Sequence, residues 1–263
     1  MKRVLLSLVF LLALSHITFC QEYDNASGSA ASSESASEDD KPLRNYLKIN
    51  LANLALRNYS LQYELAFSKR FSIAIGYRFM PQGGIPLLSN IESMVTIDDP
   101  DVLDALRRAQ VKNTAITPEL RLYVGKKGYG RGFYLAPFYR YAVYETAELP
   151  VKVDNNKKTV NLSGKLTTNT YGLQLGAQWA LSKHISLDWW IIGPQFGTHE
   201  SEFTGSQAVN FTTSEKKDID DFFNSFSLPK LNLKSDITNN SIKVSTSGPW
   251  AGIRAGLCLG IRL

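Results

Sequence analysis

Acidic and arginine side chains recur in this chain at positions that alternate with apolar residues. Alternate side chains of a strand point to opposite faces, so we expect these charges on the inner face of a β-sheet. Buried charges are tolerated only when they are paired and hydrogen-bonded. We therefore predict a salt-bridge network that fills the interior and sets strand register, with a proton path or small-ion conduit as the alternative role. Its predicted members are Glu64, Arg78, Glu119, Arg121, Arg140, Asp188 and Arg254.

Nucleophilic catalysis would need a serine, a histidine and an acid that converge on one reacting atom. The candidate set is His199 and Ser201, with two glutamates beside them in residues 198–202. Residues this close along a chain rarely converge on one atom, so we expect a polar loop and no enzyme activity. The histidines form no cluster with metal-ligand spacing, and we find no glycine-rich phosphate loop. The sequence thus predicts neither a metal nor a cofactor.

Eight segments show the period-two alternation that is typical of strands. They are residues 45–54, 58–68, 71–79, 115–124, 133–144, 170–181, 184–192 and 251–263. We expect the last segment to pair with the first near Leu47 and so close the sheet. Its polar face should point inward, with two arginines beside three glycines: Arg254, Arg262, Gly252, Gly256 and Gly260.

The connections between these segments alternate in length. If the chain starts in the periplasm, every even-numbered connection is periplasmic and short, whereas three of the four odd-numbered ones are long. Short periplasmic turns and long extracellular loops are typical of outer-membrane barrels, whose tilted strands cross the membrane in ~9–11 residues. The sequence therefore predicts an all-β fold, an eight-stranded antiparallel up-and-down transmembrane β-barrel over residues 45–263. The short connections are residues 68–70, 125–131 and 182–184, and the long ones are residues 81–113, 145–169 and 193–248.

The N-terminal region has the composition of an export signal followed by a tether. In residues 1–20, Lys2 and Arg3 precede an apolar run that is too short to span a bilayer, as in a secretory signal peptide. Signal peptidase would cut after Cys20, or Cys20 is instead a lipidated N-terminus. Residues 21–44, rich in serine, alanine and acidic residues, predict a disordered periplasmic linker.

Charge and cysteine content narrow the chemistry further. The formal net charge is +5, or +3 without Lys2 and Arg3, and the basic residues are spread along the chain, so we expect no nucleic-acid partner. The chain has two cysteines. Cys258 is the only thiol left if Cys20 is removed, and an intrachain disulfide is then excluded.

Two of the long connections contain helix patterns. Residues 99–110 begin with an N-cap aspartate followed by a proline. Residues 214–226 carry an apolar stripe at helical spacing. We expect this stripe to pack as a lid on the barrel mouth, or to form a docking surface for a partner protein or the outer leaflet. Its residues are Ile219, Phe222, Phe223 and Phe226.

Residues 45–263 resemble the small eight-stranded outer-membrane barrels typified by the transmembrane domain of outer membrane protein A. They are more closely similar to a family of bacterial outer-membrane barrels classed as a domain of unknown function. The stretches that carry the resemblance are residues 60–73, 116–123 and 132–141, together with the terminal strand. The resemblance implies a cell-envelope location in the outer membrane and brings no catalytic residues with it.

These observations predict a non-enzymatic outer-membrane barrel with a structural or surface-interaction role. Its expected partners are outer-membrane lipid, the barrel-insertion machinery and, through its loops, another envelope protein. Two alternatives stay open. One is a barrel enzyme that acts on lipid or peptide at the outer rim through His199 and Ser201, and the other is a soluble periplasmic barrel that binds a ligand.

Overall fold

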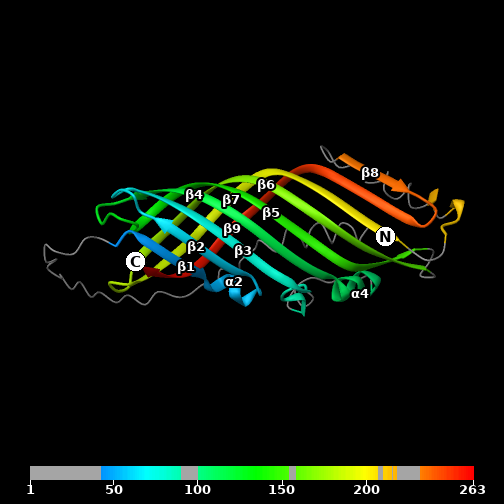
Figure 1. Cartoon of the computed structure of the whole chain (residues 1–263), viewed down its shortest axis with the longest axis horizontal. Helices are drawn as coiled ribbons and strands as arrows, with labels where there is room; N and C mark the ends of the chain where they lie inside the picture. The colour runs from blue at the N-terminus through cyan, green and yellow to red at the C-terminus, as the bar shows by residue number, and fades with distance from the viewer. Residues whose placement is uncertain (1–42, 90–99, 154–157, 207–209, 215, 218–231) are drawn as a thin grey trace.

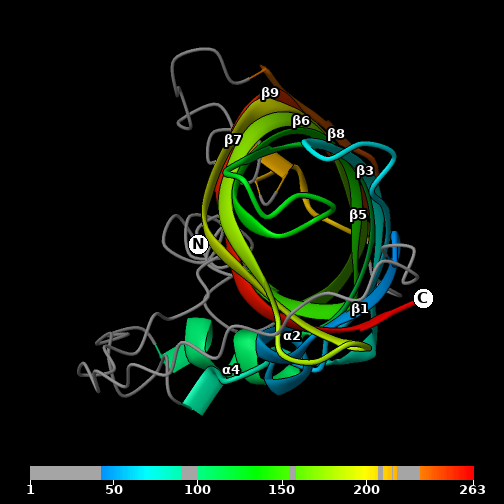
Figure 2. The ribbon, with the colours of Figure 1, turned by 90° about the vertical axis from the view of Figure 1, so that its left-hand side faces the viewer.

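The structure is a computed structural model that describes residues 43–89, 100–153, 158–206, 210–214, 216–217 and 232–263. Within these residues, nine strands form one antiparallel sheet in the order β1-β2-β3-β4-β5-β6-β7-β9-β8, and β9 also pairs with β1. Eight strands thus close into the predicted ring, and β8 extends the sheet beside the far part of β9 (Figure 1, Figure 2). The strands are β1 Asn45–Asn50, β2 Tyr59–Leu65, β3 Phe71–Gly84, β4 Gln110–Val124, β5 Gly132–Val153, β6 Lys158–Ala180, β7 Ile185–Ser206, β8 Asn232–Ile237 and β9 Ser241–Arg262.

The ring closes between its first and last strands. In this antiparallel pair Leu47 lies opposite Ile261 and Lys48 opposite Gly260, so the predicted pairing of the terminal strand is confirmed. A Cβ on Gly260 would lie 2.9 Å from the Cγ of Lys48 and 2.7 Å from the Oγ of Ser186. Glycine at this seam therefore leaves room for the lysine stem, inside a ring whose interior is just wide enough for side chains to fill.

Along the long axis of the sheet the outward face changes from apolar to polar, and buried apolar side chains appear on the inward face. On β6, the outward residues from Leu175 to Tyr171 are apolar and exposed, while the inward ones are polar. Further along the same strand the outward position is Lys165, and the inward ones are the buried Leu166 and Leu162. The alternation continues across the boundary, so it is the surroundings of each face that change. We call the first region the apolar band and the second the extension.

The apolar band contains large hydrophobic side chains from every strand of the ring. Their exposure is high for residues of this kind, reaching 69% at Tyr171 and 67% at Phe196. Other exposed members are Leu47, Leu61, Ile73, Ile75, Leu120, Leu135, Leu173, Trp189, Ile192, Ile253 and Leu257.

The extension occupies much of what the sequence indicated as long connections. Residues 145–169 are mostly strand, because β5 and β6 remain paired as far as Val153 opposite Lys158. Within residues 193–248, β7 continues to Ser206 and β9 begins at Ser241, with β8 paired to β9. These boundaries were wrong because the outward residues turn polar here, and a polar outward face looks like a loop in the sequence. The long excursions still lie at one end of the ring (Figure 1).

In the part of the chain that the structure describes, helices α2 and α4 lie beside the barrel (Figure 1). The expected strand over residues 45–54 ends at Asn50, whose side chain accepts a hydrogen bond of 3.0 Å from the Asn53 backbone N–H and caps helix α2, Leu51–Ala55. Helix α4, Pro100–Arg108, confirms the first predicted helix apart from its N-cap, which lies outside the described residues. The apolar stripe at 219–226 also lies outside them. Among the described residues, no helix is long and apolar enough to cross a membrane.

Candidate functional site

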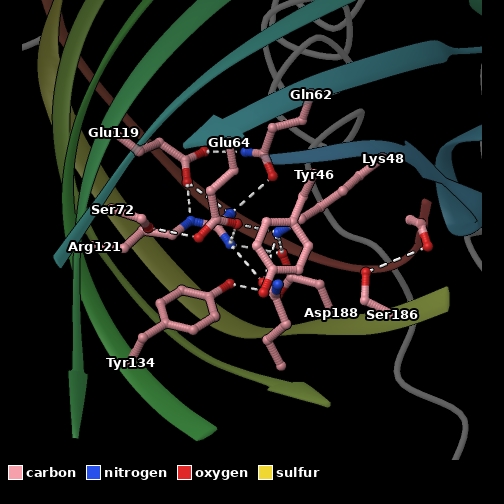
Figure 3. Close-up of polar contacts among 12 residues, drawn as sticks. Tyr46, Lys48, Gln62, Glu64, Ser72, Glu119, Arg121, Tyr134, Ser186 and Asp188 are labelled. Carbon is pink, nitrogen blue, oxygen red and sulfur yellow. Dashed lines mark hydrogen bonds and ion pairs between the residues drawn. The ribbon is translucent and has the colours of Figure 1, made fainter. Parts of the chain in front are cut away.

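Charged side chains from four strands meet inside the barrel (Figure 3). Lys48 comes from β1, Glu64 from β2, Arg121 from β4 and Asp188 from β7, and all four side chains are 0% exposed. The strand alternation that turns apolar residues outward brings them together, because each occupies an inward position. With Glu119 and Arg254 these residues form what we call the central network.

Arg121 is the hub of the central network. Its Nη1 lies 2.7 Å from Asp188 Oδ2 and 3.1 Å from Glu64 Oε2. Its Nη2 and Nε lie 3.0 and 3.1 Å from Glu119 Oε2, and Nη2 also donates to Gln62 Oε1 at 2.9 Å. One guanidinium thereby bridges three carboxylates on three strands.

Lys48 supplies the second cation and was missed at the sequence level. Its ammonium donates to Glu64, to Asp188 Oδ2 at 2.7 Å and to Gln178 Oε1 at 2.6 Å. The available signal was its place between Leu47 and Ile49, which turns its side chain inward. Nothing in the sequence indicated its height in the barrel or its partners.

Neutral donors complete the hydrogen bonding of the acids. The hydroxyls of Tyr123 and Ser72 donate to Glu64 Oε1 at 2.7 and 2.5 Å, and the Tyr134 hydroxyl donates to Asp188 Oδ1 at 2.8 Å. Buried ion pairs are stable when the remaining lone pairs are satisfied in this way. The central network is balanced, since three cations (Lys48, Arg121, Arg254) face three acids (Glu64, Glu119, Asp188).

The predicted network divides into two parts in the structure. Five of its seven predicted members meet in the central network. Arg254 is one of these five and is held by an ion pair of 2.5 Å between its Nη2 and Glu119 Oε1. Arg78 and Arg140 lie apart, on the extension side of the central network, and form ion pairs with none of its acids. Arg78 Nη2 instead lies 3.4 Å from the hydroxyl of Tyr144. Arg262 also points inward, but at the other end of β9, where its Nη1 donates to Ser182 O at 3.2 Å.

The β4–β5 turn covers the end of the barrel opposite the extension (Figure 2). The buried Tyr46 donates from its hydroxyl to the backbone oxygen of Tyr129 at 2.5 Å, and Arg44 lies over the ring of Tyr129. Gly130 adopts φ +72°, and a Cβ there would lie 2.9 Å from the Tyr46 ring. The turn therefore depends on glycine to reach inward over this mouth.

His199 and Ser201 both point inward in the extension and are 8% exposed. They meet at Thr246, whose Oγ1 lies 3.2 Å from His199 Nε2 and 2.6 Å from Ser201 Oγ. The flanking Glu200 and Glu202 are exposed on the opposite face, so neither is placed to orient the imidazole. Burial lowers the pKa of His199 and favours its neutral form. In the described part of the chain, no group of three or more histidine, cysteine or acidic side chains could hold a metal ion.

Comparisons with known proteins place the chain in a family. A crystal structure of Acinetobacter baumannii CarO2 is similar with a TM-score of 0.35 and 13% identity, over 80% of this chain and 98% of that chain. Comparison with curated proteins gives no match. The model of the family described as "Protein of unknown function (DUF3575)" matches residues 31–220, which is most of the chain and includes β1 to β7. The chain belongs to this DUF3575 family.

Proposed function

We propose that this protein is a sealed, non-enzymatic outer-membrane barrel that presents its extension as an extracellular interaction surface. The observation that carries the proposal is the change of the outward face from the exposed apolar side chains of the band to the polar side chains of the extension. Large exposed apolar surfaces are rare on soluble proteins and mark contact with a membrane or a partner. If lipid surrounds the band, its outward apolar side chains lie in an apolar environment and their exposure costs no free energy.

The dimensions of the band support a membrane crossing. On β6 the exposed apolar positions run from Tyr171 to Trp179, which agrees with the ~9–11 residues of a tilted membrane-spanning strand. Beyond this level the outward face carries ion pairs suited to water, such as Lys112 Nζ to Glu145 Oε2 at 2.8 Å and Lys243 Nζ to Glu202 Oε1 at 3.0 Å.

The two ends of the ring suggest its orientation. Short connections join β2 to β3, β4 to β5 and β6 to β7 at one end, and the extension lies at the other (Figure 1). Outer-membrane barrels have short turns on the periplasmic side and long excursions on the extracellular side. The extension would then be extracellular and the cover formed by the β4–β5 turn periplasmic.

The filled interior favours a sealed barrel rather than an open pore. The central network joins strands on opposite sides of the ring, and the Tyr46–Tyr129 contact covers the end below it. A barrel of eight strands has little free interior even without such a network. Since the interior offers no channel, we assign the protein a role in interaction through the extension. Residues Ile219, Phe222, Phe223 and Phe226 stay a predicted docking stripe.

Cysteine labelling of intact cells tests location and orientation together. Thr204 is exposed on the extension, and Lys69 is exposed in the β2–β3 turn. A membrane-impermeant maleimide should label Thr204→Cys on intact cells, and Lys69→Cys only after the outer membrane is permeabilised. The wild-type chain is the control, since Cys258 is buried. Release of the protein by osmotic shock, or equal labelling of both variants on intact cells, would overturn the proposal.

A serine-directed fluorophosphonate probe tests the enzyme alternative. The absence of a carboxylate at His199 among its described contacts favours a non-catalytic role for Ser201. We expect no covalent labelling of Ser201 in the folded protein. If Ser201 is labelled, and the labelling disappears in His199→Ala while the barrel stays folded, the protein is an enzyme instead.

A further inference from the structure

A cavity lies inside the barrel, on the extension side of the central network. Its lining combines three arginines with polar side chains from α2, β2 and β4 and with one tryptophan. Its volume of about 30 Å³ exceeds the ~10–15 Å³ that one water molecule requires. Among the lining residues are Asn53, Ser60, Arg78, Thr117, Arg140, Trp190 and Arg254.

The arginines bring unpaired donors to this cavity. Arg140 is 6% exposed, and its Nε and Nη2 have no hydrogen-bond partner among the described residues. Arg254 is 7% exposed and uses Nη2 for Glu119, while its Nη1 has no such partner. The Nε of Arg78 is also buried and unpaired within the described chain. Buried donors without partners are costly, which makes an acceptor in the cavity strongly favourable.

Two of the three arginines at the cavity, Arg78 and Arg140, form no ion pair with any described acid, whereas Arg254 is paired with Glu119. Its lining contains three guanidinium groups and no carboxylate. Glu119, the nearest acid of the central network, is already shared between Arg121 and Arg254. Arg78, Arg140 and Arg254 line the same small cavity, so their like charges repel one another there. An anion between them would relieve the repulsion.

Aromatic residues lie around the cavity and pack against one of its arginines, Arg254. The guanidinium of Arg254 lies 3.8 Å from the ring centroid of Trp190 and 5.2 Å from that of Phe138. On the extension side, Tyr144 and Trp250 belong to an apolar cluster of buried residues. A weakly polar surrounding of this kind strengthens charge-assisted hydrogen bonds.

We propose that this cavity binds a small oxyanion, of phosphate, sulfate or carboxylate type, between Arg78, Arg140 and Arg254. Guanidinium groups present planar pairs of donors that match two oxygens of such an anion. Chloride has the charge but lacks the spaced acceptors. The site therefore distinguishes oxyanions from halides, and it stands on the interior of the barrel alone, independently of any surface partner.

Calorimetric titration of the purified protein in octyl glucoside tests the site. Sodium phosphate, sulfate and acetate are compared with sodium chloride at matched ionic strength. We expect saturable binding of at least one oxyanion that chloride does not reproduce. Arg140→Gln should weaken this binding at least tenfold, and Arg78→Gln, which changes a less buried arginine, should weaken it as well. Lys165→Gln, on the outward face of the extension, removes one positive charge away from the cavity and should leave binding unchanged.

Heat-modifiable migration on gels shows whether each variant is folded before it is titrated. Equal responses to chloride and the oxyanions would overturn the proposal, as would wild-type affinity in both folded arginine variants. Binding only of a short-chain phospholipid, with no response to free phosphate, would reassign the arginines to lipid contact and also overturn it. A protein that fails the cell-labelling test but passes this titration would retain its anion site and lose its proposed location.

Discussion

Arg121 on β4 and Asp188 on β7 are joined across the interior of the barrel by a contact of 2.7 Å between Nη1 and Oδ2. The strands that carry them are not neighbours, since β5 and β6 lie between them in the sheet. This pair therefore ties together two walls that no backbone ladder connects. Through this pair, the central network helps to set how β4 and β7 lie relative to each other across the ring.

Arg121→Met should destabilise the folded barrel severely. The substitution removes one cation and leaves Glu64, Glu119 and Asp188 with less compensation inside the barrel. Removing one partner of a buried ion pair typically costs about 3–5 kcal/mol, and we expect a loss of that size in the free energy of unfolding. Urea unfolding in lipid vesicles measures it.

Lys112→Met is the matched control, because it also removes a cation from an ion pair on β4. The Lys112 and Glu145 side chains are 46% and 41% exposed, and exposed pairs contribute about 0–1 kcal/mol. Similar losses in the two variants would show that the central network is no more important to stability than a surface pair.

Gly130→Ala should loosen the cover that the β4–β5 turn forms over the mouth opposite the extension. The substitution is strained twice, by the φ of +72° and by a Cβ placed 2.9 Å from the Tyr46 ring. A non-glycine residue in the left-handed region costs about 1–2 kcal/mol. We therefore expect the free energy of unfolding to fall by at least that amount. Gly84→Ala is the control, since its Cβ meets nothing within 4 Å. A Gly130→Ala barrel as stable as the control would mean that the turn does not rest on Tyr46.

The sequence determined which face each charged residue occupies but left its height in the barrel open. Period-two alternation turned Glu119 and Arg140 inward correctly. Strand register then sets Arg140 opposite Thr170, farther toward the extension than Phe138, the partner of Glu119. Because register depends on pairing around the whole ring, one sequence could not separate the arginines of the central network from those of the cavity.

In the extension, strand residues were predicted as loops from their polarity. Lys165 and Glu145 are opposite each other on paired strands, yet their polarity suggested a loop. A strand whose outward face meets water has the opposite pattern to one whose outward face meets an apolar environment. The sequence could establish the alternation, but the change of surroundings that inverts it became visible only with the strands in place.

Cys258 should resist thiol reagents until the barrel unfolds. It is 1% exposed on the inner face of β9, and a cysteine buried in this way reacts only through opening of the structure. We expect maleimide labelling of the wild type to follow the urea transition. Thr204→Cys supplies an exposed thiol and should react at once in the folded state. Rapid labelling of Cys258 in the folded wild type would contradict a filled interior.

His199 should make the folded protein less stable as the pH falls below about 6.5, the ordinary value for histidine. Burial lowers the pKa of His199 in the folded state, and the groups it contacts, Thr246 and the Pro249 carbonyl, carry no charge. Between the folded and unfolded pKa values the unfolded chain binds a proton that the folded chain does not, so stability falls with pH through this window and levels off below it.

Urea unfolding midpoints measured from pH 7.5 down to pH 5 check this dependence on His199. His199→Asn should flatten the curve above the range where carboxylates titrate, because asparagine cannot gain the proton. His184→Asn, in the exposed β6–β7 turn, should keep the wild-type slope and so controls for the loss of a histidine. A slope that persists in His199→Asn but vanishes in His184→Asn would assign the pH response to the opposite end of the barrel. His199 is buried in the extension beside uncharged partners, and these surroundings disfavour its charged form.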